Sequence, residues 1–281
     1  MSHTKAITRS EPSLLLFIVD QSGSMAGAIA GQSTSKAQFV ADAINRSIYQ
    51  LAVKATRDAS GPRHYFDVGV IGYGATIAPG WIAPFNGRVV HPLPALAQSP
   101  ARTESRKRRE SDGAGGVLEL DVEFPMWVEA GSGGGTPTAE AFGLAAEEVT
   151  AWIASHASSF PPTVIHITDG EHTTDDPEPI AAALRTLRTA DGETLLFNIH
   201  VDTRAGASVL FPSSVEELRD PHARKLFAMS SSPIGPMAAR IAREFGIPVS
   251  EATRFFGYRC DAIEFIRLLD IGTPDAAGGD R

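Results

Sequence analysis

Three short apolar stretches constrain the fold of this chain more than any other feature. They read LLLFIV at residues 14–19, TVIHIT at 163–168 and LLFNIHV at 195–201. Near-continuous apolar runs of this length are typical of strands buried on both faces of a parallel sheet. After the first run, Val40, Ile44 and Ile48 recur at the spacing of one helical face. The alternation of strands with helices predicts an α/β fold, a Rossmann-like, doubly wound, mainly parallel sheet flanked by helices.

The domain organisation follows from length and from one unusual segment. The chain has 281 residues, 43% of them hydrophobic, which is enough to bury a substantial core. We expect a single domain over 13–270, with flexible tails at 1–12 and 271–281. The polar, glycine-rich stretch SPARTESRKRRESDGAGG predicts a mobile insertion at about 92–116. The alternating sequence VLELDVEF that follows predicts a half-buried strand with an acidic stripe.

The basic run at 102–109 inside this insertion has four interpretations. It could be a solvated loop, a site for nucleic acid or membrane phosphates, a segment lying against the acidic stripe of Glu119, Asp121 and Glu123, or a protease-sensitive tether. The formal net charge of -8 argues against nucleic acid as the main partner, because phosphate binding needs a basic face.

The cysteine content and the apolar runs bear on localisation. Cys260 is the only cysteine, so the chain has no internal disulfide to indicate an oxidising compartment. The N-terminal residues lack an apolar leader, and no apolar run approaches the roughly 20 residues that span a bilayer. We therefore expect a cytoplasmic protein with no membrane partner.

Polar side chains stand where the predicted strands end. The candidate metal ligands are Asp20, Ser22, Ser24, Thr136 and Asp169. In open α/β sheets the functional crevice lies beyond the carboxyl ends of the strands, so we expect these residues to meet there. Two carboxylates and three hydroxyls form an oxygen-only set, which suits Mg²⁺, with Mn²⁺ or Ca²⁺ possible, and does not suit zinc.

Two residues near this set have open roles. Thr138 is the alternative to Thr136 as the hydroxyl ligand, because both lie in GGGTPT at the start of a predicted helix. His172 lies close to the proposed metal in sequence and either supports the site, contacts a partner or is a loop histidine at its rim. We expect His166 and His200, inside predicted strands, to be core residues.

The motifs DQSGSM, GGTPT and TDGE together resemble those of von Willebrand factor A (vWA) domains, most closely the bacterial intracellular branch that includes TerY-like proteins. The resemblance implies that the five candidate ligands form a metal-ion-dependent adhesion site (MIDAS). An Asp or Glu from a protein partner would fill the open position of the ion. The implied function is a metal-dependent interaction module without enzymatic activity. Relatives of this kind imply a kinase, phosphatase or ATPase partner in a stress-response, signalling or defence system.

Other functions remain open from the sequence. A haloacid-dehalogenase-like phosphotransfer enzyme would use Asp20 as its nucleophile, but it would need an Asp where Ser22 stands, and no catalytic lysine is evident. A phosphate loop is excluded because no lysine follows the glycines before Thr136. A purely structural metal is the third possibility.

Overall fold

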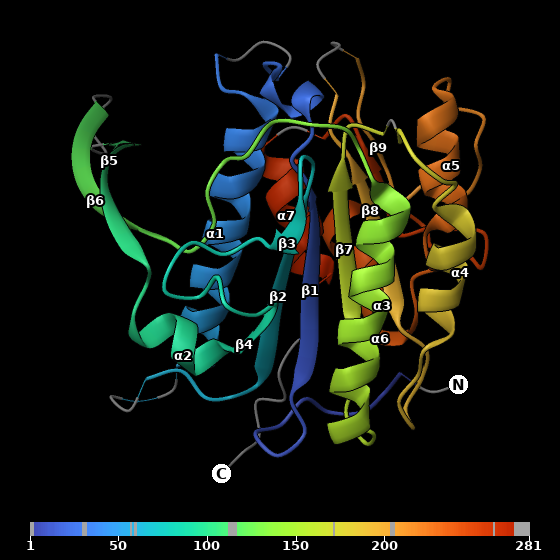
Figure 1. Cartoon of the computed structure of the whole chain (residues 1–281), viewed down its shortest axis with the longest axis horizontal. Helices are drawn as coiled ribbons and strands as arrows, with labels where there is room; N and C mark the ends of the chain where they lie inside the picture. The colour runs from blue at the N-terminus through green and yellow to red at the C-terminus, as the bar shows by residue number, and fades with distance from the viewer. Residues whose placement is uncertain are drawn as a thin grey trace.

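A computed structural model describes residues 3–29, 33–56, 58, 61–111, 117–170, 172–202, 206–260 and 262–272. A central sheet with helices packed on both faces forms the body of the molecule, and a long hairpin stands beside it (Figure 1). The predicted α/β class and the mainly parallel sheet are therefore confirmed.

The elements of the body and the hairpin have the following bounds. The strands are β1 (Ser13–Asp20), β2 (Phe66–Tyr73), β3 (Ile77–Pro79), β4 (Val90–Pro92), β5 (Arg102–Ser111), β6 (Val117–Met126), β7 (Thr163–Thr168), β8 (Leu195–His200), β9 (Val209–Leu210) and β10 (Phe256–Tyr258). The helices are η1 (Gly23–Ala26), α1 (Lys36–Ala55), α2 (Leu93–Gln98), α3 (Thr138–Ser155), α4 (Glu178–Thr186), α5 (Pro221–Met229), α6 (Gly235–Phe245) and α7 (Ala262–Gly272).

The order of the strands in the sheet determines where a binding crevice can form. The sheet runs β3-β2-β1-β7-β8-β10-β9, and β4 pairs with β2. Strands β2, β1, β7, β8 and β10 are parallel, whereas β3, β4 and β9 pair antiparallel near the edges. The chain leaves β1 towards β2 on one side and later returns to form β7 on the other. The boundary between β1 and β7 is thus a topological switch point, where such sheets form their binding crevice.

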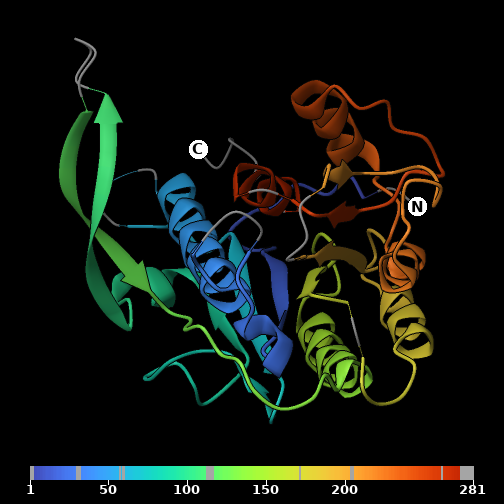
Figure 2. The same cartoon turned by 90° about the horizontal axis from the view of Figure 1, so that it is seen from above.

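Strand β1 is buried on both faces, which explains its unbroken apolar sequence. Leu15, Phe17 and Val19 join the core formed with α1, α6 and α7. Leu14 and Ile18 point the other way and pack in the core formed with α3 and α4. Figure 2 shows these two helical layers on opposite sides of the sheet.

The predicted mobile insertion at 92–116 is wrong in its described part. Residues 93–98 form α2, and β5 pairs with β6 in an antiparallel hairpin. The register sets Lys107 opposite Asp121 and Ser105 opposite Glu123, so the basic run lies along the acidic stripe. Because opposite charges face each other across the strands, a polar sequence can pair here instead of forming a loop. Residues 112–116 lie outside the described part of the chain.

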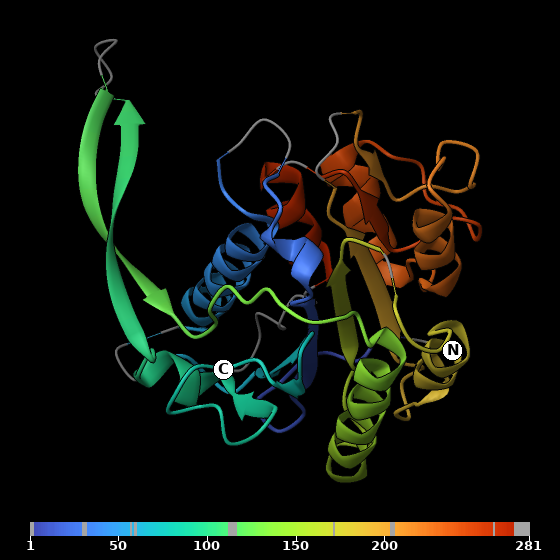
Figure 3. The same cartoon turned by 45° about the horizontal axis from the view of Figure 1, so that its top comes forward.

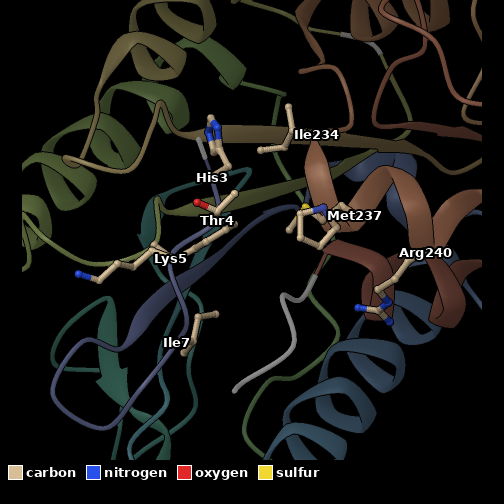
Figure 4. A pocket seen from close by; sticks show the side chains of 9 residues that line it. His3, Thr4, Lys5, Ile7, Ile234, Met237 and Arg240 are labelled. Atoms are coloured by element: carbon tan, nitrogen blue, oxygen red, sulfur yellow. The ribbon is translucent and has the colours of Figure 1, made fainter. Parts of the chain in front are cut away.

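The expected flexible tail at 1–12 does not hold for residues 3–12. Ile7 is buried in the core, and the backbone N–H of His3 donates to the carbonyl oxygen of Asp191 at 2.9 Å. This segment lies beside α6, with a cavity of about 90 Å³ between them (Figure 4). At the other end, α7 runs to Gly272 and Ile271 is buried, while residues 273–281 lie outside the description. No helix within the described ranges is long and apolar enough to cross a bilayer.

Candidate metal centre

Asp20 ends β1 as a fully buried carboxylate at the switch point. Its Oδ1 accepts a hydrogen bond from the backbone N–H of Ser22 at 2.8 Å. Its Oδ2 accepts one from the hydroxyl of Thr168 at 2.7 Å, across the boundary from β1 to β7. The sequence analysis missed Thr168, although it directly precedes Asp169 at the end of a predicted strand. These two bonds fix the orientation of the Asp20 carboxylate.

The two serines follow on the turn that leads into η1. The hydroxyls of Ser22 and Ser24 lie 2.9 Å apart. Ser22 is buried and Ser24 is exposed, so the pair extends from the interior to the surface. The alternate spacing therefore brings both hydroxyls together.

The glycine-rich loop crosses the carboxyl ends of the strands and lies directly on this turn (Figure 3). The N–H of Gly133 donates to the carbonyl of Gln21 at 2.8 Å, and the N–H of Gly23 donates to the carbonyl of Gly134 at 3.1 Å. Gly134 has a φ of +77°, and a Cβ there would lie 2.4 Å from the backbone nitrogen of Ala75. Any side chain at Gly134 would therefore collide with the backbone after β2 and displace the glycine-rich loop.

Thr136 is buried at the end of the glycine-rich loop, just before α3. Its backbone N–H donates to the hydroxyl of Thr173 at 2.7 Å, and the N–H of Thr173 donates back to its carbonyl oxygen. Among the described residues its own hydroxyl has no hydrogen-bond partner. The hydroxyl of Thr138 instead donates to the carbonyl of Thr136 at 3.4 Å. Of the two threonines, Thr136 is the one left with a free hydroxyl for a ligand.

Asp169 follows β7 and carries the least satisfied oxygen of the site. Its Oδ2 accepts a hydrogen bond from the ammonium of Lys36 at 2.8 Å, and both side chains are almost completely buried. Its Oδ1 is buried with no hydrogen-bond partner. A buried carboxylate oxygen without a partner is costly, so this atom is suited to receive a cation. Lys36 was not among the residues predicted from the sequence.

The carboxylates of Asp20 and Asp169 lie close enough for their charges to interact. Burial raises the pKa of Asp20, hydrogen bonds from Ser22 and Thr168 lower it, and the negative charge of Asp169 raises it again. The result is a pKa above the usual range for an aspartate. The repulsion between the two carboxylates is the interaction that a bound cation would relieve.

The donor set fits a hard divalent cation. Within the described ranges no group of three or more His, Cys, Asp or Glu side chains is arranged to hold a metal ion. The oxygens available are those of two aspartates and three hydroxyls, with the unpartnered Oδ1 of Asp169 among them. Such oxygens suit Mg²⁺ or Mn²⁺, which take few carboxylates and complete their shell with water.

The histidines near the site fall into two groups. His166 and His200 are buried in β7 and β8, as predicted for core residues. His172 is partly exposed, and its ring lies edge-on to that of His222 at 6.2 Å between centroids. Its role remains a prediction.

Comparisons with known proteins give only distant likenesses. No protein-family model matches the chain. No curated protein matches it either. Among solved structures, the manganese-loaded TRAP protein of Plasmodium vivax is 14% identical with a TM-score of 0.44, over 92% of this chain and 72% of that one.

Two bacterial structures give similar values. An aerotolerance-related membrane protein of Bacteroides fragilis, carrying multiple mutations to serine, is 12% identical with a TM-score of 0.39 over 92% and 98% of the two chains. The pilus adhesin SpaC of Lactobacillus rhamnosus GG is 13% identical with a TM-score of 0.43. This chain aligns over 95% of its length with only 31% of the adhesin.

Proposed function

We propose that this protein is a divalent-metal-dependent interaction module of the vWA type. The unpartnered, buried Oδ1 of Asp169 carries the proposal, because it lies at the switch point where a cation would satisfy it. Asp20, Ser22, Ser24 and Thr136 lie on the turn and loop that meet at the same edge of the sheet. We propose that these five residues form a MIDAS that holds Mg²⁺, or alternatively Mn²⁺ or Ca²⁺.

The residues of the chain have distinct parts in this function. Thr168 orients the Asp20 carboxylate, and the hydrogen bonds of Gly133 and Gly23 attach the glycine-rich loop that carries Thr136 to the turn that carries the serines. When bound, the ion supplies a positive centre that attracts an acidic side chain. The exposed position of Ser24 leaves this edge of the sheet open towards solvent, where a partner can approach.

The class of partner follows from this chemistry. We propose a protein that presents an Asp or Glu to the metal centre. By resemblance to TerY-like proteins, that partner is a kinase, phosphatase or ATPase of a cytoplasmic stress-response, signalling or defence system. In the alternative, the ion only stabilises the fold, and the protein would then need no partner at the metal.

The test is metal-dependent binding and capture. We expect isothermal titration with Mg²⁺ or Mn²⁺ to show one site in the wild type and none in Asp20→Ala. Asp175→Ala, at an exposed aspartate outside the five-residue set, is the matched control and retains binding. Lysate capture in Mg²⁺ and in EDTA then separates a partner site from a structural ion. Equal recovery of every protein in both conditions would refute metal-gated interaction.

The Lys36–Asp169 ion pair favours one second candidate, a phosphotransfer enzyme of the haloacid-dehalogenase type. It supplies the lysine that the sequence analysis did not find, while Ser22 still stands where an acid/base Asp is needed. In that case Asp20 would be the nucleophile. Hydrolysis of a generic phosphate ester by the wild type, and its loss in Asp20→Asn, would support this enzyme over the interaction module.

A further inference from the structure

Lys36 is a buried cation inside the candidate metal centre. It is the first residue of α1, and its backbone N–H donates to the carbonyl of Gly27 at 2.8 Å. Its side chain is 6% exposed, and its ammonium lies 2.8 Å from Oδ2 of Asp169. Lysine is almost never buried in this way unless it is paired, so Asp169 accounts for its position.

The positive charge of Lys36 opposes the binding of a second cation at Asp169. Asp20 and Asp169 carry two negative charges, and Lys36 returns one positive charge. A divalent ion that binds Asp169 would lie close to the ammonium in a region shielded from water. The repulsion between two cations at such short range is large where the effective dielectric constant is low. An ion on Oδ1 and the ammonium on Oδ2 would therefore repel each other across one carboxylate, so each weakens the contact of the other with Asp169.

We propose that Lys36 competes with the divalent cation for Asp169, so that the centre alternates between a lysine-closed and a metal-loaded state. This inference rests on the proposed function, because it regulates the same site. The flexible four-carbon stem of lysine allows its ammonium to withdraw without movement of the helix. In the closed state the ammonium neutralises the Asp169 carboxylate, which stabilises the protein without metal.

The competition has a measurable consequence for affinity. A ligand that binds only one of two states loses affinity in proportion to the fraction of that state. If Lys36 occupies Asp169 in most molecules, removal of its charge tightens metal binding by about 10-fold or more. The same change removes the counter-charge of the buried Asp169 carboxylate, so it lowers the stability of the metal-free protein.

The experiment compares Mn²⁺ titrations of the wild type, Lys36→Met and Lys54→Met by calorimetry. Methionine keeps most of the length of the lysine side chain and removes its charge. Lys54 lies on the same helix, where it pairs with Asp270 outside the centre, so its variant is the matched control. We expect Lys36→Met to bind Mn²⁺ about 10-fold more tightly than the wild type, and Lys54→Met to bind as the wild type does.

Thermal melting gives a second readout of the same competition. We expect Lys36→Met to melt below the wild type in EDTA and to gain more from saturating Mn²⁺. If Lys36→Met does not fold without metal, Lys36→Gln keeps a hydrogen-bond donor for Asp169 and replaces it in both measurements.

The outcomes separate this inference from the function on which it rests. Binding by all variants with equal affinity would overturn the competition and leave the metal site in place. Binding by Lys36→Met but not by the wild type would support the competition in its strongest form. Failure of every folded variant to bind Mn²⁺, Mg²⁺ or Ca²⁺ would overturn the metal site and the competition together.

Discussion

His166 lies in the middle of β7 and connects two buried polar side chains, those of Tyr73 and Asn198. Its Nε2 is 2.8 Å from the hydroxyl of Tyr73, and its Nδ1 is 2.8 Å from Oδ1 of Asn198. The amide nitrogen of Asn198 donates to the hydroxyl of Ser230, so its Oδ1 is free to accept. The imidazole therefore carries its proton on Nδ1 and accepts from Tyr73 on Nε2.

Burial keeps this imidazole neutral and predicts a pH dependence of stability. Burial lowers the pKa of His166 from 6.5 to about 4, while the hydrogen bond with Asn198 acts in the opposite direction. Between these values the unfolded chain binds a proton that the folded chain does not, so stability falls as the pH falls. We expect this histidine to cost about 2 kcal/mol of unfolding free energy between pH 6.5 and pH 5.

The variant His166→Gln tests this prediction, because an amide keeps hydrogen-bonding groups and does not titrate. Urea unfolding at several pH values should show a shallower decline for the variant than for the wild type. Parallel curves across this pH range would mean that His166 does not set the dependence.

At the scale of elements, the β5–β6 hairpin is attached to the body through its base. The guanidinium of Arg106 pairs with Asp42 of α1 at 2.9 Å and lies over the ring of Phe124 at 4.0 Å. Further out, Leu120 is 41% exposed, and Lys107 pairs with Asp121 of the opposite strand. Figures 2 and 3 show the β5–β6 hairpin extending away from the central sheet.

We predict that the outer hairpin is dispensable for the fold. Replacement of residues 104–124 by Asn-Gly removes the ion pair of Arg106 with Asp42, and exposed or half-exposed pairs contribute about 1 kcal/mol or less. The unfolding free energy should fall by about that amount, and Mn²⁺ affinity should stay unchanged. Chemical denaturation and calorimetry measure both. Loss of the native fold would show that the hairpin supports the core.

The elements differ in how far the sequence could predict them. Strand β1 was predictable because both of its faces are buried, so every position from 14 to 19 is apolar. Strand β5 was not, because its pairing depends on charges supplied by β6 and not on burial. No feature of the sequence indicated that Lys36 would be buried at the site. A lysine at the start of a helix normally reaches solvent, and only the packed fold shows that it turns inward to Asp169.

At the scale of the whole molecule, the candidate centre joins segments that are far apart in the chain. The turn after β1, the loop before α3 and the segment after β7 meet through hydrogen bonds of Gly23, Gly133 and Thr173. The sequence predicted this meeting from the positions of Asp20 and Asp169 at strand ends. The roles of the five residues as metal ligands remain a prediction.

A cation held by all three segments should stabilise them together. We predict that saturating Mn²⁺ slows hydrogen exchange at the backbone amides of Gly23, Gly133 and Thr173. Each of these amides donates a hydrogen bond to another of the three segments. The amide of Lys107 in the hairpin, remote from the centre, should be unaffected. Protection limited to Gly23 would mean that the ion contacts the serine turn alone, and the glycine-rich loop and Asp169 would then contribute no ligand. Protection at all three amides, lost in Asp20→Ala, would require one ion shared by the three segments.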